Sequence, residues 1–333
     1  MVSTQVTQNI QQWVVADPVE AFLTHLQNTD KSRATVRVYR IGLSVFREWF
    51  EENTGNAFEA VVVTPLDVVM YRDWLRDTRK LAPTTVNTYL AGLRAFLSYS
   101  LREGLVNVNA AKDVSGVRVD DPVPQWLGRQ EQYQLLRTCE NLVQLGDLRA
   151  KKYPGDAGAV WPKRDRALVR LMLAAGLRRA EVCALDVEDV IINERSGWVA
   201  VRNGKGGKAR RVPINSDARK ALSSWLEVHP LKRADGTFTM GTALFISQKG
   251  NRRLNKRSLA DRIAVIAERA NVAGVHPHTL RHTCAKNLID AHEGIEKVSK
   301  ILGHSKLETT LIYTQPSDAD LLRAVEKTVW ERN

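Results

Sequence analysis

A twelve-residue pattern that occurs twice near the start of the chain constrains the fold more than any other feature. Thr-Val-x-x-Tyr-x-x-Gly-Leu-x-x-Phe begins at Thr35 and again fifty residues later at Thr85. Its apolar spacings of three, four and seven predict an amphipathic helix for each copy, with one stripe facing a core. We expect Thr35, and Thr84 or Thr85, to act as N-caps. Two copies are too few for a solenoid, so they indicate two similar helices of one small bundle, with their Tyr and Phe side chains in its core.

The first of these helices also has a basic face. Arg33, Arg37, Arg40 and Arg47 share one side of it by helical spacing. Two interpretations are open: a solvated surface, or a surface that contacts the phosphates of a nucleic acid. Arg33, Arg37 and Arg40 are therefore candidate DNA-binding residues.

The length of the chain favours two domains. At 333 residues it exceeds the size at which one core usually stops growing. We expect a helical domain over residues 1–113. Residues 114–125 contain glycine, two prolines and adjacent aspartates with little helical periodicity, which predicts an extended linker. The second domain would then cover residues 126–333.

Helices and a few short strands are expected in the second domain. Alternating apolar residues predict short strands at 190–192, 198–201 and 211–214. Helical periodicity predicts helices at 164–175, 179–185, 217–227, 259–270, 278–291, 295–302, 308–313 and 317–330. Residues 146–162, rich in glycine and charge, are expected to form a surface loop. The predicted fold class is mainly α with one small antiparallel β-sheet.

The net charge of +12 is unevenly distributed. Residues 1–120 hold 13 Lys and Arg and 13 Asp and Glu, so residues 121–333 carry the whole positive excess. A polyanion is the natural partner of such a domain, and a solubilising surface charge is the alternative.

The composition argues against several other classes of protein. Cys139, Cys183 and Cys284 are odd in number and lack metal-ligand spacing, so we expect buried thiols rather than disulfides or a metal site. The first residues lack the basic and apolar pattern of a signal peptide, and no apolar run reaches membrane-spanning length. We therefore expect a cytoplasmic protein that does not contact a membrane.

Two segments without acidic residues concentrate positive charge in the second domain. Lys205 lies in a glycine-rich turn between two predicted strands, outside the strand-loop-helix context of a nucleotide-binding loop. A basic hairpin that follows phosphates is one interpretation and a solvated turn is the other. A second run, at 249–257, is interpreted as a surface that binds a nucleic-acid backbone without sequence preference. The candidate DNA-binding residues of the two segments are Arg202, Lys208, Arg210, Arg211, Arg252, Arg253, Lys256 and Arg257.

His278, Arg281 and His282 share one face of a predicted helix by their i, i+3 and i+4 spacing. A polar edge of the core would explain them without any function. A zinc site is disfavoured, because no Glu follows the first histidine and Arg281 would place a cation beside the metal.

Transfer of a phosphodiester without a metal requires few functional groups. Arginines stabilise the negative charge of the non-bridging oxygens, a general acid protonates the leaving oxygen, and a side-chain nucleophile conserves the bond for rejoining. A tyrosine suits the last role because its hydroxyl, with a pKa of about 10, is easier to deprotonate than an aliphatic alcohol. No acidic cluster indicates Mg²⁺, and we expect neither a metal nor a cofactor. The sequence contains such a set in order: Arg178, Lys205, His278, Arg281, His304 and Tyr313.

These residues resemble those of the tyrosine recombinase (phage integrase) family, and the resemblance covers essentially the whole chain. The segments similar to the first arginine box, the hairpin lysine, the His-x-x-Arg box and the closing box with its tyrosine are 175–181, 204–206, 278–282 and 302–313. Two departures are Ala180, where the family often has Ser or Thr, and Gln315, where a His often follows the tyrosine. Neither removes a proposed catalytic group.

The resemblance implies roles for the main residues. Tyr313 would be the nucleophile that forms a 3′-phosphotyrosyl link, and Lys205 the general acid for the 5′-oxygen. Arg178 and Arg281 would clamp the scissile phosphate, with Glu181 orienting the first arginine box.

The histidines would assist these groups. By the same resemblance, His278 and His304 would hydrogen-bond the phosphate or help to transfer a proton. His282 would be a structural hydrogen-bonding residue.

The resemblance also implies an assembly. A helical, SAM-like core-binding domain and a mixed α/β catalytic domain would form a C-shaped clamp on double-stranded DNA. Four copies would act on two DNA sites through a Holliday junction, with the helix at 317–330 docked on a neighbouring copy. This scheme leaves room for accessory DNA-bending proteins. We expect integration, excision or transposition of a mobile element.

Three alternatives stay open. One is Xer-like resolution of chromosome dimers, and another is relaxation of DNA in the manner of a type IB topoisomerase. The third is a non-enzymatic DNA-binding regulator that retains the fold. The two-domain length and the terminal helix favour a recombinase over a topoisomerase, and the complete set of catalytic residues argues against a regulator.

Overall fold

The computed structural model describes residues 17–29, 31–119, 125–202, 209–304, 307–314, 321–322 and 325–326. The chain divides into two compact units, Met1–Pro122 and Val123–Asn333. Each unit has a hydrophobic core of its own. In the described part of the chain, no helix has both the length and the apolar character needed to cross a membrane.

The described residues of the first unit form a helical bundle. Its elements are α1 (Pro18–Asn28), α2 (Arg33–Thr54), the short 3-10 helix η1 (Ala60–Val62), α3 (Pro65–Asp77) and α4 (Pro83–Arg102). α2 and α4 pack along each other through much of their length, and α1 and α3 contact both of them. Aromatic side chains from α1 to α4 fill the core between them.

The repeated sequence pattern explains how α2 and α4 pack. Gly42 on α2 lies against the ring of Tyr89 on α4, and Gly92 on α4 lies against the ring of Tyr39 on α2. A Cβ atom on Gly42 would stand 3.0 Å from Tyr89 Cδ1, and one on Gly92 would stand 3.1 Å from Tyr39 Cδ1. The two copies therefore interlock, glycine against tyrosine in both directions. The predicted pair of bundle helices is confirmed, with the phenylalanine of each copy fully buried.

The predicted threonine N-caps are wrong. Ser32 caps α2, and its hydroxyl accepts a hydrogen bond of 3.1 Å from the backbone N–H of Thr35, which lies within the first turn. α4 begins after Ala82 without a side-chain cap, and Pro83, whose fixed backbone angle suits a first helical residue, opens it ahead of Thr84 and Thr85.

The second unit combines helices with a small sheet, so the predicted fold class is confirmed. Its helices before the sheet are α5 (Arg129–Lys152), α6 (Trp161–Ala175), α7 (Arg179–Ala184) and the 3-10 helix η2 (Val187–Asp189). The strands are β1 (Val190–Ile192), β2 (Gly197–Val201) and β3 (Arg210–Pro213). The helices after the sheet are α8 (Ser216–Glu227), α9 (Lys256–Arg269), α10 (Pro277–Asp290), α11 (Ile295–Leu302) and α12 (Glu308–Leu311).

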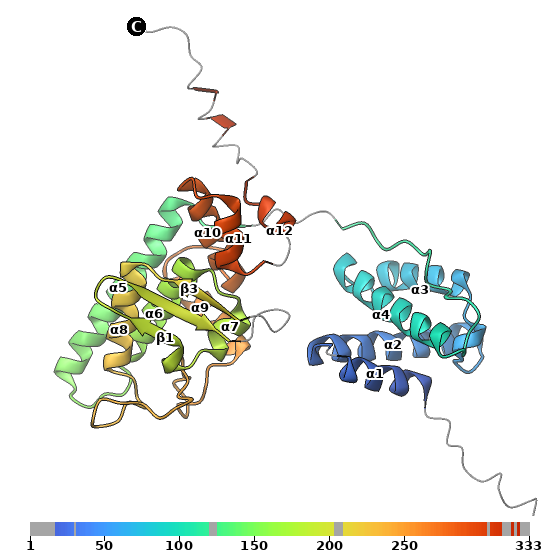
Figure 1. Ribbon diagram of the computed structural model, residues 1–333, viewed down its shortest axis with the longest axis horizontal. Coiled ribbons are helices and arrows are strands. Elements are labelled where there is room, and N and C mark those ends of the chain that lie inside the picture. The colour runs from blue at the N-terminus through green and yellow to red at the C-terminus, as the bar shows by residue number, and fades with distance from the viewer. Residues whose placement is uncertain are drawn as a thin grey trace, which may run out of the picture. The chain divides into compact units, whose positions relative to one another are not determined.

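The sheet is antiparallel in the order β1-β2-β3. Val199 on β2 pairs with Val190 on one side and with Val212 on the other. Val199, Val201 and Val212 are buried while their neighbours along the strands are more exposed, which is the alternation expected of a sheet with one face on a core. α6 lies in the middle of this core and contacts α5, α8 and α10 (Figure 1).

The loop predicted at 146–162 is wrong in its first part, because α5 continues to Lys152. Gly146 is buried inside this helix, where a Cβ atom would stand 2.7 Å from the carbonyl oxygen of Ala159. The glycine lets the returning chain pack closely against the helix; it does not end the helix.

Two other predicted segments are only partly described. Val114 is buried in the core of the first unit, and the backbone of Val117 makes hydrogen bonds of 2.7 and 2.8 Å with the side chain of Asn87. Residues 120–124 of the predicted linker lie outside the described residues, as does most of the helix predicted at 317–330.

Candidate active site

The C-terminal end of α11 is the point at which the predicted site residues meet. The last carbonyl groups of a helix have no partner within it and carry the negative end of the helix dipole. Here three consecutive carbonyl oxygens each accept a hydrogen bond from an arginine that is distant in the sequence. The pairs are Ile301 with Arg210 Nε at 3.3 Å, Leu302 with Arg281 Nη2 at 2.8 Å, and Gly303 with Arg178 Nη2 at 2.7 Å.

Gly303 makes this arrangement possible. Its φ of +67° is a left-handed conformation that ends α11, and its N–H donates to the Ser299 carbonyl at 2.9 Å. A Cβ atom on Gly303 would stand 2.7 Å from Arg210 Cζ. Any other residue would therefore suffer both backbone strain and contact with the guanidinium group. The same turn places His304 directly beside the three arginines.

Arg281 is the most buried of the three arginines, with 4% of its surface exposed. It also donates through Nη1 to the carbonyl oxygen of Gly176, at the end of α6. Burial and the nearby charge of Arg178 lower the pKa of Arg281 to about 10, so it stays protonated at neutral pH. A buried cation of this kind is stabilised further when an anion binds next to it.

Glu181 joins two of the arginines. Its carboxylate accepts hydrogen bonds of 2.8 Å from both Nη atoms of Arg210, and bonds of 2.9 and 2.8 Å from Arg178 Nη1 and the Arg178 backbone N–H. Burial alone would raise the pKa of Glu181, but the hydrogen bonds from Arg210 and Arg178 hold it below its usual value. We name these four residues the arginine cluster: Arg178, Glu181, Arg210 and Arg281.

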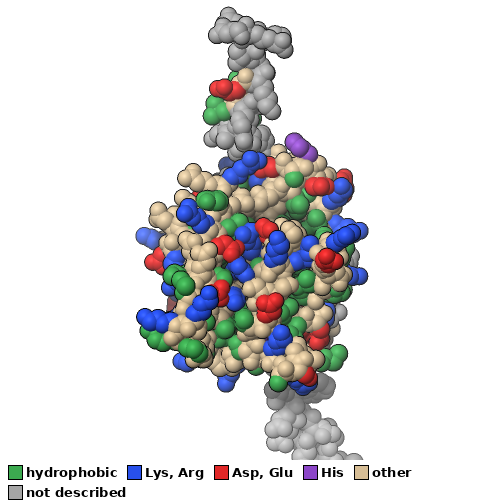
Figure 2. Space-filling view, turned by 90° about the vertical axis from the view of Figure 1, so that its left-hand side faces the viewer, with side chains coloured by type: hydrophobic (Ala, Val, Ile, Leu, Met, Phe, Trp, Pro, Cys, Tyr) green, Lys and Arg blue, Asp and Glu red, His purple; other side chains and the backbone are tan. Residues whose placement is uncertain are grey.

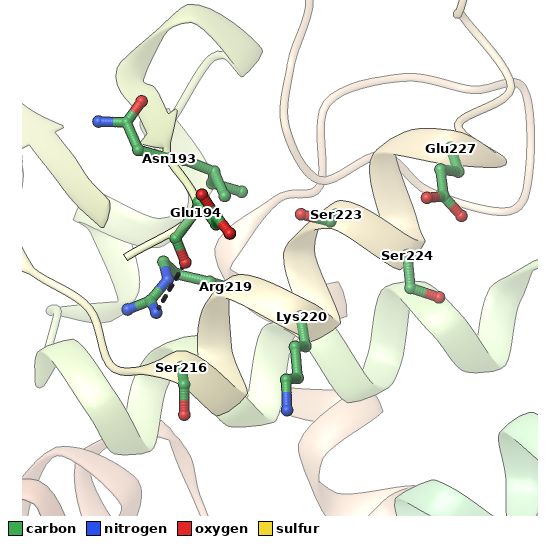
Figure 3. Close-up of a pocket in the computed structure, with 9 residues that line it drawn as sticks. Asn193, Glu194, Ser216, Arg219, Lys220, Ser223, Ser224 and Glu227 are labelled. Atoms are coloured by element: carbon green, nitrogen blue, oxygen red, sulfur yellow. Dashed lines mark hydrogen bonds between the residues drawn. The ribbon is translucent and has the colours of Figure 1, made fainter. Parts of the chain in front are cut away.

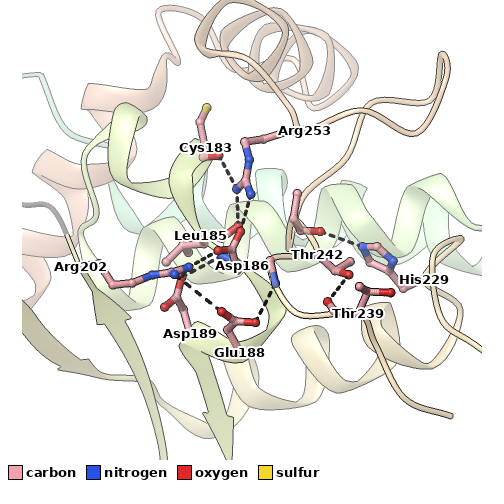
Figure 4. Close-up of polar contacts among 12 residues, drawn as sticks. Cys183, Leu185, Asp186, Glu188, Asp189, Arg202, His229, Thr239, Thr242 and Arg253 are labelled. Carbon is pink, nitrogen blue, oxygen red and sulfur yellow. Dashed lines mark hydrogen bonds and ion pairs between the residues drawn. The ribbon is translucent and has the colours of Figure 1, made fainter.

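Arg210, in the arginine cluster, is the first residue of β3, and a second set of ion pairs holds the end of its neighbour β2. Arg202, just after β2, pairs with Asp186 and donates to Asp189 at 2.6 Å, and Arg253 pairs with the same Asp186 (Figure 4). Arg202 and Arg210 therefore tie the end of β2 and the start of β3 to carboxylates on neighbouring elements. Lys205 is one of residues 203–208, between these two arginines in the sequence, which lie outside the described residues.

These contacts bear on the predicted DNA-binding residues. Arg202, Arg210 and Arg253 are engaged within the protein by carboxylates, which sequence reasoning did not anticipate. Arg40 likewise pairs with Glu20. Lys208 lies outside the described residues.

The other members of the predicted set lie at the surface. Arg211 lies over the ring of Trp198 at 5.4 Å. On the face drawn in Figure 2, Lys and Arg side chains are interspersed with Asp and Glu. The remaining exposed members are Arg33, Arg37, Arg252, Lys256 and Arg257.

Tyr313 lies on the other side of the site. Only 1% of its surface is exposed, and it packs with Ala285, Val298 and Leu302. Its hydroxyl oxygen is 2.6 Å from Nδ1 of His282. Burial raises the pKa of Tyr313 above its usual value, and the charge of Arg281 offsets part of this rise.

His304 makes a parallel contact with the same segment. Its Nδ1 is 2.8 Å from the hydroxyl oxygen of Thr310, on α12. Burial and the charges of Arg281 and Arg178 lower the pKa of His304 to about 4, so its ring is neutral at pH 7. Two imidazoles thus hold the hydroxyl groups of one short segment, which we name the tyrosine segment (residues 308–314).

His278 is exposed at the start of α10, and its ring centroid lies 6.3 Å from that of His282. Burial of part of its ring and the neighbouring His276 and Arg281 lower its pKa. The structure therefore brings together Arg178, Arg281, His304 and Tyr313, with His278 at the margin.

Other features of the described residues do not compete with this site. A cavity of about 500 Å³ between the β1–β2 turn and α8 is lined by Ser216, Arg219 and Ser223 among others, and by none of the predicted catalytic residues (Figure 3). Within the described part of the chain, no group of three or more His, Cys, Asp or Glu side chains could hold a metal ion.

Comparison with known proteins decides the family. Residues 135–320 match the phage integrase family, and residues 19–104 match the phage integrase N-terminal SAM-like domain. The chain belongs to the phage integrase family of tyrosine recombinases. As a tyrosine recombinase it is an enzyme, as the resemblance in the sequence predicts.

Individual relatives of this recombinase match it over most of its length. A tyrosine recombinase XerC of Thermodesulfovibrio yellowstonii is 30% identical over 317 residues, which is 92% of this chain and 94% of the relative. A XerC of Vibrio parahaemolyticus is 34% identical over 245 residues, which is 73% of this chain and 71% of the relative.

Solved structures share the fold. XerH site-specific recombinase bound to a palindromic difH substrate matches with a TM-score of 0.68 and 22% identity, over 94% of this chain and 84% of that one. A lambda integrase dimer bound to a COC′ core site matches with a TM-score of 0.64 and 13% identity, over 95% and 97%.

Sequence reasoning about this recombinase missed two contacts. Arg210 was assigned to the DNA surface, yet it lies inside the arginine cluster. His282 was assigned a structural role, yet it is the histidine that touches the hydroxyl of Tyr313. Its position four residues after His278 indicated the right helix face, but nothing in the sequence indicated which histidine would meet the tyrosine.

Proposed function

We propose that this recombinase cuts and rejoins double-stranded DNA at specific sites through a 3′-phosphotyrosyl intermediate on Tyr313. The observation that carries the proposal is the position of Tyr313, beside a cluster of three arginines that has a single carboxylate among its four members. Such a cluster carries a net positive charge, so it is suited to bind the negatively charged oxygens of a phosphodiester.

Within this proposal each residue has a distinct task. Arg178 and Arg281 hold the non-bridging oxygens of the scissile phosphate, while Glu181 and the carbonyl groups at the end of α11 fix their planes. Lys205 protonates the 5′-oxygen as it leaves, and the paired Arg202 and Arg210 keep its turn in place. His304 and His278 support the phosphate or its proton transfers.

We also propose that each copy cleaves with its own tyrosine. The support is that Tyr313 contacts His282 of the same chain and is influenced by the charge of Arg281 of the same chain. The wider scheme is that four copies act on two DNA sites through a Holliday junction, with the two units clamping the DNA.

Two biological tasks fit this chemistry. Integration, excision or transposition of a mobile element is one. Relatives named XerC, which match over 92% and 73% of this chain, favour the Xer-like alternative of resolving chromosome dimers. The DNA that flanks the coding region distinguishes them: inverted repeats beside the gene support a mobile element.

The decisive experiment is the isolation of a covalent adduct. The protein is incubated with fragmented genomic DNA, denatured, and the DNA retained on protein is sequenced to find the site. A nicked duplex built on that site should then trap a protein–DNA band that Tyr313→Phe abolishes. An adduct that persists in Tyr313→Phe, or no adduct with the wild-type protein, would refute the assignment.

A further inference from the structure

His282 is the least explained residue of the site. It is not one of the residues that the resemblance makes catalytic, yet its ring lies next to those of His278 and Tyr313. The ring centroids of His278 and His282 are 6.3 Å apart, and those of His282 and Tyr313 are 5.5 Å apart. The short contact between His282 Nδ1 and Tyr313 Oη joins an imidazole directly to the reacting atom.

The direction of this hydrogen bond follows from burial and charge. Burial and the neighbouring His278, Arg281 and His276 lower the pKa of His282 to about 4, so its ring is neutral at pH 7. A neutral imidazole has one nitrogen that accepts and one that donates. Tyr313 is almost fully buried, and its O–H proton needs an acceptor there. Nδ1 of His282 is that acceptor, which places the ring proton on Nε2.

The other histidines are less well placed for this task. His304 uses Nδ1 to contact Thr310 Oγ1. His278 is exposed, and its ring contacts are with the rings of His276 and His282. Among the described residues, His282 is therefore the base best placed to reach the phenol.

We propose that His282 accepts the proton of Tyr313 during strand cleavage; this inference rests on the proposed function. The Oη–phosphorus bond forms, the bond from phosphorus to the 5′-oxygen breaks, and the Oη proton moves to His282 Nδ1. The 5′-oxygen takes its proton from Lys205. In rejoining, the 5′-hydroxyl attacks, Tyr313 leaves, and His282 returns the proton to it.

On this proposal, binding of DNA makes His282 more basic. Without DNA, the proton stays on oxygen because the pKa of His282 is about 4 and that of Tyr313 is raised. The scissile phosphate neutralises the charge of Arg281, one of the groups that lower the pKa of His282. Proton transfer then accompanies attack, as in other general base catalysis. The free protein thereby keeps an unreactive phenol until a phosphate is bound.

The first test needs no DNA. Nitrogen-15 NMR of the histidine rings should show His282 with an unprotonated Nδ1 and a protonated Nε2 at pH 7, and the Nδ1 signal should shift in Tyr313→Phe. A proton on Nδ1 would overturn the proposal, because His282 would then be the donor.

The second test measures single-turnover cleavage of the nicked duplex from pH 5 to pH 9. General base catalysis contributes about 10² to 10⁴-fold, so His282→Ala should be at least about 100-fold slower while it still binds the duplex. His282→Asn, which keeps an oxygen acceptor near Nδ1, serves as the variant that retains packing. Because the pKa of His282 is about 4 in the free protein, its protonation should begin to lower the wild-type rate only toward pH 5, and both variants should lack that fall. His292→Asn, at an exposed left-handed residue, is the matched control and should cleave normally.

The third test replaces Tyr313 by a tyrosine analogue with a more acidic phenol. It distinguishes a His282 that accepts the proton from one that only positions the ring of Tyr313. Fluorotyrosine at position 313 needs less help to lose its proton, so it should narrow the gap between wild type and His282→Ala at least tenfold. An unchanged gap would mean that His282 only positions the ring and would refute the base role. Normal cleavage by His282→Ala would refute the inference alone, whereas absence of any wild-type adduct would refute the proposed function.

Discussion

The two sides of the active site are held in different ways. In the arginine cluster, each guanidinium group is fixed by carbonyl oxygens, by a buried carboxylate or by both, from elements that span α6 to α11. The tyrosine segment includes a helix of only four residues, and the hydroxyl groups of Thr310 and Tyr313 bond to neutral imidazoles. Under the proposed function, the side that would stabilise charge is therefore preorganised before DNA binds, while the proposed nucleophile depends on a few contacts that protonation would reverse.

The difference follows from what each side must do. The charge-stabilising groups gain most from being fixed, because they then need no rearrangement as negative charge develops on the phosphate. On the proposed function, Tyr313 would have to leave its buried position to form a bond with phosphorus and later return. Weak, local contacts suit that task.

The largest expected effect comes from removing the charge that holds the arginine cluster together. Glu181→Gln leaves Arg178 and Arg210 without a buried counter-charge, and breaking a buried pair in this way costs about 3 kcal/mol. We expect faster hydrogen exchange in α7 and β3, and cleavage of the nicked duplex about 100-fold slower because Arg178 is no longer fixed.

Glu188→Gln is the matched control for this change. Glu188 is an exposed carboxylate that lies 3.7 Å from Arg202, so its loss should alter stability by less than about 1 kcal/mol. Equal effects of the two substitutions would show that the arginine cluster is no more preorganised than an ordinary surface pair.

A smaller loss of stability is expected from a substitution at Gly303, in the turn that ends α11. Gly303→Ala adds left-handed strain of about 1 kcal/mol, and the new methyl group would lie against Arg210 Cζ, which adds about 1 kcal/mol more. Gly241→Ala isolates the strain, because Gly241 has a φ of +76° and no atom within 4 Å of its Cβ position. Urea unfolding measures how much each substitution lowers the free energy of unfolding. The difference between the two losses is the cost of the contact between the new methyl group and Arg210. If Gly303→Ala costs no more than Gly241→Ala, the guanidinium group is not fixed in place.

The sequence predicted the helices and strands that depend on local periodicity. The repeated pattern predicted α2 and α4, and alternation predicted the three strands, because periodicity records which face of an element is buried. Helix starts were less predictable, since Ser32 and Pro83 compete with nearby threonines for the same role. Gly146 was misleading, because a glycine that makes room for Ala159 resembles one that ends a helix.

The candidate site was predictable as a set of residues but not as an arrangement. The contacts that fix Arg178, Arg210 and Arg281 end on backbone carbonyl groups, and every residue has one, so the sequence does not mark which will accept. Likewise, the meeting of His282 and Tyr313 depends on how the tyrosine segment returns to α10, which is a tertiary property.

The smallest expected effect is a difference in the pH response of the two sides. The pKa of both His282 and His304 is about 4 in the folded protein, against about 6.5 for an unperturbed histidine. The unfolded chain therefore binds more protons between these values, so stability is full above about pH 6.5 and falls as the pH drops toward 4. The hydrogen bonds from Arg210 and Arg178 hold the pKa of Glu181 below its usual value, so the arginine cluster should respond less than the histidines over this range. Because both histidines are partly exposed, we expect a loss of only about 1 kcal/mol in the free energy of unfolding between pH 7 and pH 5.

Urea unfolding of the full chain at several pH values measures this loss. The control is the double variant His282→Asn and His304→Asn, which retains the other histidines. The wild type should lose more stability than the double variant over this interval, and hydrogen exchange at low pH should quicken in the tyrosine segment before it does in α7. An identical pH slope in the two proteins would show that neutral imidazoles do not hold the nucleophile.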